Sequence, residues 1–340
     1  MAEEVWMLQT KKADFKQIGA RFRIDPVTAR IIRNRGIEGE AAIDRYLNGT
    51  LDDLYDPMLL KDMERAVSIL CEAVDTGKKI RIVGDYDIDG VCSTYILLQA
   101  FERLGSDVDF EIPDRIKDGY GINESIIEQA HADGVEVILT CDNGISAFHQ
   151  VELAKKYGMT VVITDHHEVP LDGEKEKIPP ADAVIDPKQA DCPYPFPEIC
   201  GAVVAYKLVQ VLYARRGVPQ MEWLDLLEFA AIATVGDVMK LQDENRILVK
   251  YGLKKMAQTK NLGLRRLAEK NNLDLGAITA YHIGFVIGPC LNAGGRLKTA
   301  KEALALLRAQ SEEEAERLAE ELKELNDTRK DMTEQGTEAA

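Results

Sequence analysis

Hydrophobic and polar residues follow two different patterns along this chain, and the change comes near residue 78. Before it, the stretches DPVTARIIRNRGI (25–37) and LKDMERAVSILCEAVDTG (60–77) have the apolar spacing of amphipathic helices. After it, short runs rich in β-branched residues recur, several of them separated by helix-like stretches. Such alternation of strands and helices is typical of a parallel sheet covered by helices. The pattern therefore predicts a doubly wound, mainly parallel α/β fold behind a helical lead-in.

The predicted strands and the segments around them divide the chain into four parts. Residues 187–200 hold four prolines, so we expect a surface connection there. The chain then becomes chiefly helical, and its last segment opens with a capping box formed by Ser311 and Glu314. The predicted strands are KIRIV (79–83), VDFEIP (108–113), VEVILT (135–140), TVVIT (160–164) and ADAVID (181–186), and the predicted parts are a helical lead-in (1–77), an α/β domain (78–200), its helical remainder (201–310) and a long acidic helix (311–340).

The composition limits the class of protein without identifying it. A net charge of -16 and an isoelectric point near 4.9 argue against a general nucleic-acid coat protein, because phosphate binding usually leaves a basic surface. They do not exclude a nuclease, whose bound cations neutralise part of an acidic cleft. We expect no secretory signal and no membrane span, since no apolar stretch approaches the roughly 18 residues required. The six cysteines are scattered and form no CxxC pair, so we expect reduced thiols and a cytoplasmic protein.

The stretch VGDYDIDGV (83–91) raises the first question about chemistry. Its aspartates Asp85, Asp87 and Asp89 alternate and precede a glycine, as at the start of a calcium-binding EF-hand loop. The twelfth position of such a loop requires a bidentate Glu, but here it is Ile96. The flanking pattern of strand, acidic turn and helix indicates a βα unit instead. Asp89 could simply cap the following helix, but three carboxylates this close repel one another unless a cation or a basic group is near.

Metal-compatible side chains follow three of the predicted strands. Asp85 and Asp87 follow the first, Asp142 follows VEVILT, and the motif Asp-His-His (165–167) follows TVVIT. If these strands are neighbours, their carboxyl ends bring the side chains to one edge of the sheet. A mixed carboxylate and imidazole site suits Mn²⁺ or Mg²⁺, and also Fe or Zn, better than calcium. Several Asp ligands together favour two ions about 3.5–4 Å apart, which activate water and hold a phosphoryl group.

On these residues the sequence resembles the DHH phosphoesterases, a family named for the motif that stands here at 165–167. It is similar in particular to the RecJ branch, whose members degrade single-stranded DNA from the 5′ end. The resemblance covers roughly residues 25–335, with its blocks in the family's order. The four blocks that carry it are GDYDIDGVCST (84–94), CDNGIS (141–146), TDHHEVP (164–170) and ATVGDVMKLQDENR (233–246).

The resemblance implies a metal site with two divalent cations, Mn²⁺ as the first expectation and Mg²⁺ as the alternative. Asp142 is the expected bridging ligand. Asp89 is expected to cap a helix or to support the site from behind, rather than to bind a metal directly. The five positions that match the family's metal ligands are Asp85, Asp87, Asp142, His166 and Asp237.

Other matching residues are implied to handle the phosphate. His167 falls on the histidine that contacts the scissile phosphate, and Asp165 is expected to orient a neighbouring imidazole. Arg115 and Arg296 match arginines associated with nucleic-acid phosphates, for which a planar bidentate donor is well suited. A surface ion pair is the alternative for each arginine.

Three aromatic residues outside these motifs receive separate predictions. Tyr194 and Phe196 lie in the proline-rich segment, where they either stack on nucleic-acid bases or pack within the loop. His282 is expected to be a packed core histidine.

The chain departs from the family pattern in two ways. Many RecJ proteins have a histidine two positions before the first Asp, where this chain has Val83. The family also continues into a second domain, DHHA1, whose glycine- and histidine-rich motif holds the substrate and does not appear here. We expect these residues to be the catalytic amino-terminal part of a longer protein, with 311–340 leading toward DHHA1, and to bind DNA weakly alone. A shorter relative with a different substrate is the alternative.

The resulting expectation is a metal-dependent 5′→3′ exonuclease on single-stranded DNA that serves DNA repair and recombination. A single-strand-binding protein and a helicase are its candidate partners, and no membrane is expected. A second hypothesis keeps the same core with a smaller substrate, such as a nanoRNA, a cyclic dinucleotide or pyrophosphate. A third is a catalytically silent DNA-binding scaffold, but such relatives lose metal ligands that this chain retains.

Overall fold

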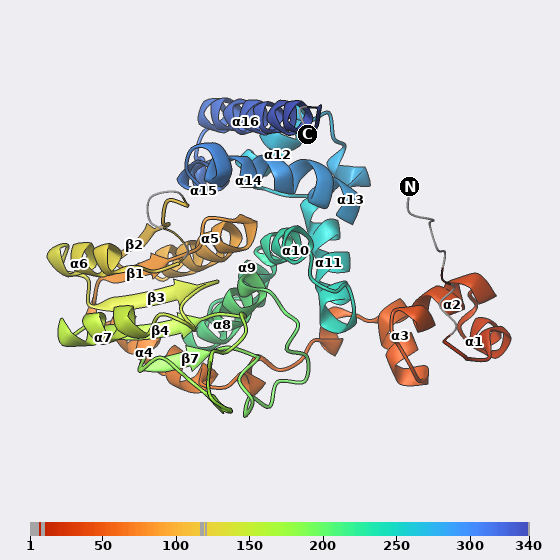
Figure 1. The fold of residues 1–340 in the computed structure, drawn as a ribbon, viewed down its shortest axis with the longest axis horizontal. Coiled ribbons are helices and arrows are strands. Elements are labelled where there is room, and N and C mark those ends of the chain that lie inside the picture. The colour runs from red at the N-terminus through yellow and green to blue at the C-terminus, as the bar shows by residue number, and fades with distance from the viewer. Residues whose placement is uncertain (1–6, 8–10, 116–118, 120, 339–340) are drawn as a thin grey trace.

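The chain folds around a five-stranded sheet in which every strand is parallel to its neighbours. The computed structural model describes residues 7, 11–115, 119 and 121–338. All five predicted runs contain a strand, and the order β2-β1-β3-β4-β7 places the three strands with metal-compatible ends side by side (Figure 1). The strands are β1 (Ile80–Val83), β2 (Val108–Glu111), β3 (Val137–Cys141), β4 (Thr160–Thr164) and β7 (Ala183–Ile185), while β5 (Leu171–Asp172) and β6 (Lys175–Glu176) form a separate small hairpin.

Helices cover both faces of this sheet, so the predicted doubly wound α/β fold is confirmed. Successive side chains of a strand point to opposite faces. In β1, Ile80 and Ile82 enter the larger hydrophobic core, whereas Val83 enters a second core on the other face. Continuously apolar strands are expected when helices cover a parallel sheet on both sides. The larger core includes α4 (Met63–Thr76), α5 (Ile88–Arg103) and α8 (Gly201–Arg216), and the second includes α6 (Glu124–Ala132) and α7 (Phe148–Lys156).

The order of the strands creates a switch point between β1 and β3. The chain leaves β1 through α5 to reach β2 at one edge, and it then returns through α6 to β3 on the other side of β1. In open α/β sheets, ligands bind outside the carboxyl ends of the strands at such a switch point. The fold therefore places a binding crevice where β1 and β3 end.

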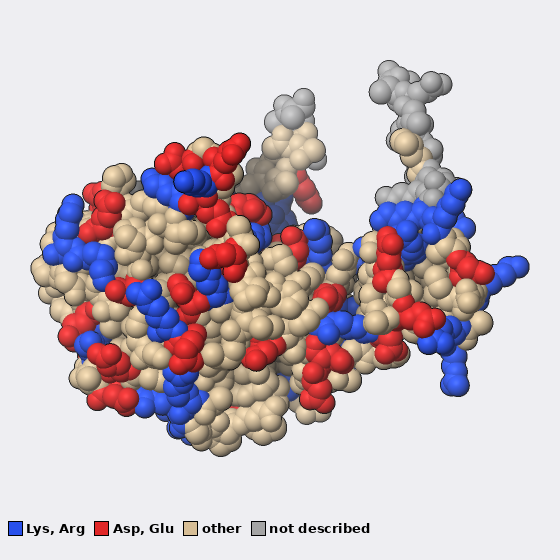
Figure 2. Space-filling view, turned by 90° about the horizontal axis from the view of Figure 1, so that it is seen from below, with Lys and Arg blue, Asp and Glu red and all other residues tan. Residues whose placement is uncertain are grey.

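A small helical lobe precedes the sheet and has a core of its own. Ile32, Ile37 and Ile43 are buried within it. Arg45 of the lobe forms an ion pair with Asp243 at 2.9 Å, which ties the lobe to the main body. Figure 2 shows the lobe standing out from the body, with both basic and acidic side chains on its surface, as on the body. Its helices are α1 (Phe15–Phe22), α2 (Pro26–Asn34) and α3 (Glu40–Asn48).

Helices also make up the carboxyl-terminal part of the chain. The last of them, α16, packs its buried residues Leu318 and Leu322 against the larger core, and Lys270 pairs with two of its glutamates. No helix among the described residues combines the length and apolarity needed to cross a bilayer. The elements are α9 (Gln220–Leu224), α10 (Leu227–Gly236), α11 (Asp243–Met256), α12 (Leu262–Lys270), α13 (Ala280–His282), a π-helical turn (Ile283–Ile287), α14 (Gly288–Leu297), α15 (Lys301–Arg308) and α16 (Glu312–Glu338).

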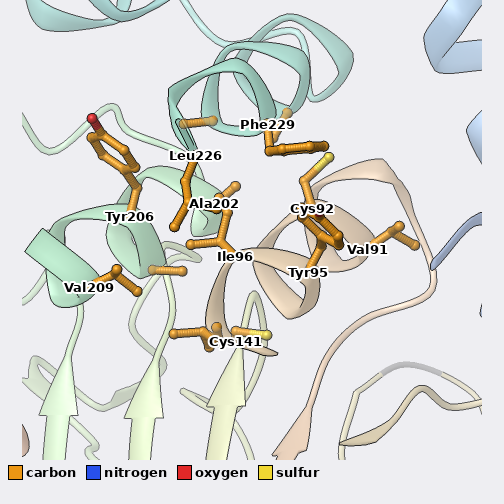
Figure 3. Packing of buried hydrophobic residues seen from close by; sticks show 14 of the residues in the cluster. Val91, Cys92, Tyr95, Ile96, Cys141, Ala202, Tyr206, Val209, Leu226 and Phe229 are labelled. Carbon is orange, nitrogen blue, oxygen red and sulfur yellow. The ribbon is translucent and has the colours of Figure 1, made fainter. Parts of the chain in front are cut away.

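The centre of the larger core lies between α5, α8 and α10 (Figure 3). The rings of Tyr95 and Phe229 pack with their centroids 4.3 Å apart, and those of Tyr206 and Trp223 lie 5.4 Å apart. Each large apolar side chain that is fully buried contributes roughly 1.5–3 kcal/mol to folding. Because α5 begins immediately after the acidic loop and α10 ends immediately before Asp237, this packing fixes two sides of the crevice.

The proline-rich segment is an irregular connection, as predicted, but only part of it lies at the surface. Tyr194 is 4% exposed, and its hydroxyl group donates a hydrogen bond to the buried carboxylate of Glu244. Ile199 and Cys200 are also buried, and Phe196 is partly buried against the larger core. Pro193 and Pro195 are exposed, so the segment lies partly at the surface. Tyr194 is buried within it and is not available to stack on bases. All six cysteines are free thiols, as expected.

Candidate metal centre

The first part of the site is the loop between β1 and α5. Asp87 caps α5, because its Oδ1 atom accepts hydrogen bonds from the backbone N–H groups of Asp89 (2.9 Å) and Gly90 (3.2 Å). A side chain at Gly90 would place its Cβ 2.3 Å from the carbonyl oxygen of Asp85, so only glycine allows this close turn. The strand, acidic turn and helix predicted here are confirmed. The turn holds the carboxylates of Asp85 and Asp87 at the carboxyl end of the sheet.

The second part is the turn after β3. Asp142 has a φ angle of +62°, a left-handed conformation that few residues other than glycine adopt. The next residue, Asn143, is buried and donates hydrogen bonds to the carbonyl oxygens of Val83 (3.0 Å) and Cys141 (2.9 Å). Asn143 thus joins the ends of β1 and β3, and a strained residue at such a junction is a common feature of functional sites.

The third part is the Asp-His-His motif after β4. The Oδ1 atom of Asp165 lies 2.7 Å from Nδ1 of His167, and its Oδ2 atom accepts a hydrogen bond from the N–H group of Ile145 at 2.9 Å. The Nε2 atom of His166 lies 3.0 Å from Oδ1 of Asp142. The motif therefore points the imidazole of His166 toward the carboxylates, and Asp165 holds the imidazole of His167.

The fourth part comes from two helix ends. Asp237 follows the last residue of α10, and its Oδ2 atom lies 3.9 Å from Nε2 of His166. Asp89 accepts hydrogen bonds from the backbone N–H groups of Gly201 and Ala202, each at 2.7 Å. Asp89 therefore caps α8, whereas Asp87 caps the helix that we considered for Asp89. The Oδ2 atom of Asp89 also lies 3.4 Å from Nε2 of His166, so Asp89 lies at the edge of the cluster.

All five predicted metal ligands lie in this one cluster. Their ligand atoms belong to three overlapping sets, and within each set the atoms lie within 4.8 Å of one another. Two of the sets share Asp142 and two share His166. The sets are Asp85, Asp87 and Asp142; Asp142, His166 and His167; and Asp89, His166 and Asp237.

The electrostatics of the cluster are unfavourable without a cation. Burial, and then the charge of Asp87, raises the pKa of Asp85 to about 7. Burial, and then the charge of Asp89, raises the pKa of Asp237 to about 7 and holds the pKa of Asp142 well above its usual value. Each of these shifts means that the ionised carboxylate is destabilised in the folded protein. The cluster gathers more negative charge than its own residues neutralise.

The residues present suit divalent cations. The Oδ1 atom of Asp85 and the Nδ1 atom of His166 are buried without a hydrogen-bond partner in the described part of the chain. Buried polar atoms without a partner are rare in native proteins and call for a specific explanation. Carboxylate oxygens together with an imidazole nitrogen are ligands for Mn²⁺ and Mg²⁺. The cluster can therefore hold such ions, with Asp142 placed between two of the ligand sets.

The two predicted arginines line a cavity of about 280 Å³ at this cluster, together with Asp85 and Asp87. Arg115 lies over the ring of Tyr86, with its Cζ atom 5.2 Å from the ring centroid. Arg296 is carried by α14, which approaches so closely that a Cβ at Gly295 would lie 2.4 Å from the carbonyl oxygen of Tyr86. Both arginines are exposed. The structure thus places them where a phosphate beside the carboxylates would lie.

A larger cavity of about 680 Å³ lies elsewhere, between α5, α9, α10 and α12. Its charged groups are largely paired with each other, as in the ion pairs of Arg103 with Glu222 and of Lys255 with Asp225. It contains none of the three sets of metal-compatible atoms. Size alone therefore does not identify the functional site.

Two residues of the site were not predicted from the sequence. One is Asn143, which joins two strands. Asp186 follows β7 and is buried, and burial raises its pKa to about 7. The run ADAVID, which ends in this aspartate beside the third motif strand, could have revealed it. His282 is not the core histidine that we predicted, because it is partly exposed and its Nδ1 atom accepts a hydrogen bond from the N–H group of Thr279.

Comparisons with known proteins agree with this geometry. A family model described as the DHH family, N-terminal domain, matches residues 79–234. The single-stranded-DNA-specific exonuclease RecJ of Bacillus subtilis is 37% identical over 336 residues, which cover 98% of this chain and 41% of that protein. A crystal structure of exonuclease RecJ bound to manganese has 35% identity and a TM-score of 0.73, covering 81% of this chain and 68% of that one.

RecJ from Thermus thermophilus in complex with Mn²⁺ gives a TM-score of 0.78 at 32% identity, over 94% of this chain and 44% of that chain. The chain spans about half the length of the curated relatives that it matches. The motifs, the sheet order and these similarities agree. The chain therefore belongs to the DHH family and, within it, to the RecJ group.

Proposed function

We propose that the acidic cluster is the active site of a phosphodiester hydrolase that removes nucleotides from the 5′ end of single-stranded DNA. The observation that carries this proposal is the convergence of metal-compatible side chains from β1, β3, β4 and α10 beside a cavity that also holds two arginines. Relatives with 34–38% identity bear the name single-stranded-DNA-specific exonuclease. A silent scaffold would not require so many unbalanced buried carboxylates.

Two divalent cations are part of the proposal. Solved structures of RecJ contain Mn²⁺ or Mg²⁺, and we propose Mn²⁺ first and Mg²⁺ as the alternative. Asp85, Asp87 and Asp142 would hold one ion, and Asp142, His166 and Asp237 would hold the other. When bound, such ions supply an activated water molecule and neutralise charge on the phosphate.

The chain's own residues would position the phosphate and handle the proton. Burial alone would lower the pKa of His167, but the hydrogen bond and charge of Asp165 raise it to about 9. The ring therefore carries a proton at neutral pH, so it can stabilise a phosphate oxygen and donate a proton to the leaving oxygen. Arg115 and Arg296 would bind phosphates beside the cleavage point, because a guanidinium group can donate two parallel hydrogen bonds.

The proposed partners and location follow from this activity. A helicase exposes single strands and a single-strand-binding protein covers them, so both are proposed partners. We propose the cytoplasm as the location, which suits six free thiols.

The test is Mn²⁺-dependent hydrolysis of a 5′-phosphorylated single-stranded oligonucleotide that carries a 3′ fluorescent label. We expect mononucleotides to be released from the 5′ end, and His166→Ala to abolish their release. His131→Ala is the matched control, because His131 stacks on Tyr157 outside the cluster. Parallel reactions contain a dinucleotide, a cyclic dinucleotide and pyrophosphate. Hydrolysis of only these small substrates, or activity that survives His166→Ala, would overturn the proposal.

A further inference from the structure

Two exposed aromatic side chains lie on a helix that leads into the metal centre. Tyr281 is 63% exposed and Phe285 is 67% exposed, more than any other described Phe, Tyr or Trp residue. Their rings stack with centroids 4.8 Å apart. Apolar side chains that lie together at the surface often mark a site where another molecule binds. The pair is therefore a candidate binding surface.

The helix that carries this pair reaches the proposed phosphate site. Helical structure is continuous from 280 to 297, through α13, the π-helical turn and α14. Asn292 and Arg296, on the same helix, line the 280 Å³ cavity of the metal centre. A π-helical turn inside an α-helix occurs frequently at functional sites, and this one includes Phe285.

A second cavity runs from the metal centre along the helix that carries the aromatic pair. Its volume is about 180 Å³, and it shares Gly236, Asn292 and Arg296 with the cavity at the carboxylates. Gly284, next to Phe285, forms part of its wall, and Arg329 of α16 adds a second guanidinium group. The two cavities together form one path with basic groups along it, and the path reaches the helix at Gly284, the residue before Phe285.

The length of this path corresponds to a few nucleotides. Phe285 and Arg296 are separated by eleven residues of helix, which is about 16 Å at the usual rise. A strand with its phosphate at Arg296 would therefore reach the rings a few nucleotides further on. A protein partner would not need arginines next to a narrow glycine-walled path, whereas a nucleic-acid strand offers phosphates to the arginines and flat bases to the rings.

We propose that Tyr281 and Phe285 form a stacking platform for the bases that follow the scissile phosphate in the 3′ direction. This inference rests on the proposed function, since it concerns the same single-stranded substrate. The platform takes unpaired bases of any sequence, because every base has a flat face that can stack on an aromatic ring. Its role is to hold the strand in line with the metal centre.

The test compares Phe285→Ala and Tyr281→Ala with the wild-type chain on single-stranded oligonucleotides of two to twelve nucleotides. Loss of stacking is expected to weaken binding of the twelve-nucleotide strand by roughly 5- to 100-fold, and the loss should grow with length. Tyr157→Ala is the matched control. Tyr157 is an exposed aromatic residue that directly follows α7. It lies at the edge of the sheet where β4 begins, opposite the edge with the metal centre, so we expect its replacement not to change binding.

A second variant provides a direct readout of stacking. In Phe285→Trp the new indole is expected to preserve binding, and its fluorescence should fall when a strand is added. Binding that is unchanged in both alanine variants, or lost equally at all lengths, would overturn the inference. So would light scattering that shows a dimer for wild type and a monomer for Phe285→Ala, because the rings would then join two copies of the chain.

The same data separate failure of this inference from failure of the proposed function. If wild type neither binds nor hydrolyses any single strand, the proposed function itself is wrong. If wild type hydrolyses the strands and the aromatic variants match it at every length, only the stacking platform is wrong. Thermal unfolding of each variant shows whether the fold is retained, as we expect for side chains this exposed.

Discussion

Two of the groups of buried charges in this molecule are balanced in opposite ways. In the first, Lys207 and Glu244 form an ion pair of 3.1 Å with 1% and 0% exposure, and Tyr194 donates a hydrogen bond to the same carboxylate. In the second, at the carboxyl edge of the sheet, several aspartates surround His166. The pKa values of Asp85, Asp142 and Asp237 in this group are raised. The first group satisfies itself, while the second has an excess of negative charge.

Both groups are buried and charged, so buried charge alone does not identify a functional site. The balanced group ties α8 to α11 and to the segment before α8, which is a structural task. The unbalanced group has neighbouring like charges, a left-handed residue at Asp142 and buried atoms without partners. Those features destabilise the metal-free protein, and a bound cation would remove the largest of them.

The largest expected effect is that of Asp142→Asn, which removes one charge from the unbalanced group. Hydrolysis of single-stranded DNA should fall by on the order of 10³-fold, because the shared metal ligand is lost. The metal-free variant should nevertheless be at least as stable as the metal-free wild type. Asparagine tolerates the left-handed backbone and cannot ionise, whereas Asp142 ionises near its usual pKa only in the unfolded chain.

The measurements are initial rates with Mn²⁺ and urea unfolding in the presence of EDTA, at pH 7.5. If Asp142→Asn were less stable than wild type without metal, and lost activity for that reason, the two groups of charges would not differ in the way described.

The next effect concerns the balanced group, where the loss of one charge should lower the stability of the protein. Lys207→Met leaves Glu244 buried without its cation, so the free energy of unfolding should fall by roughly 3–5 kcal/mol. Adding Glu244→Gln should recover a large part of this loss, because neither partner is then charged. Urea unfolding of both variants provides the measurement. If Lys207→Met were neutral, the pair would not be the structural link that we describe.

A smaller effect is expected for Asp165→Asn, which acts through His167. The pKa of His167 is raised to about 9, so the stabilisation from this pair is complete below about pH 6.5 and is lost as the pH rises through about 9. Without the carboxylate the pKa should fall toward its usual value. The alkaline limb of the pH–rate profile should then move to lower pH, and the rate at neutral pH should drop roughly 10- to 100-fold.

A neighbouring carboxylate offers the control for that experiment. Glu168 is exposed and pairs with Lys188 at the surface, so Glu168→Gln should leave the profile unchanged. A profile that is identical in Asp165→Asn and wild type would show that the aspartate does not control the histidine.

The sequence predicted the elements of the site that depend on short-range patterns. Residues at the ends of β1, β3 and β4 could be placed at one edge because parallel strands share a direction, and the order of the sheet confirmed this. The helix after the acidic turn could be predicted from its apolar spacing.

What the sequence could not predict depends on contacts between distant segments. Asp89 caps α8, which begins more than a hundred residues later, and Tyr194 is buried because Glu244 accepts its hydrogen bond. The exposure of Phe285 follows from the way its helix packs against α10, which no local pattern reveals. The prolines correctly predicted a connection without regular secondary structure. They did not show which side chains beside them would be buried.

Isothermal titration with Mn²⁺ shows whether the unbalanced group is a divalent cation site. We expect two ions to bind per wild-type chain, with an affinity that rises from pH 6 to pH 8, because protons with pKa values of about 7 must leave Asp85 and Asp237. Asp142→Asn should bind fewer ions or bind them with lower affinity, and His131→Ala should give the same isotherm as wild type. No saturable binding to folded wild type, or binding that Asp142→Asn does not alter, would contradict this assignment.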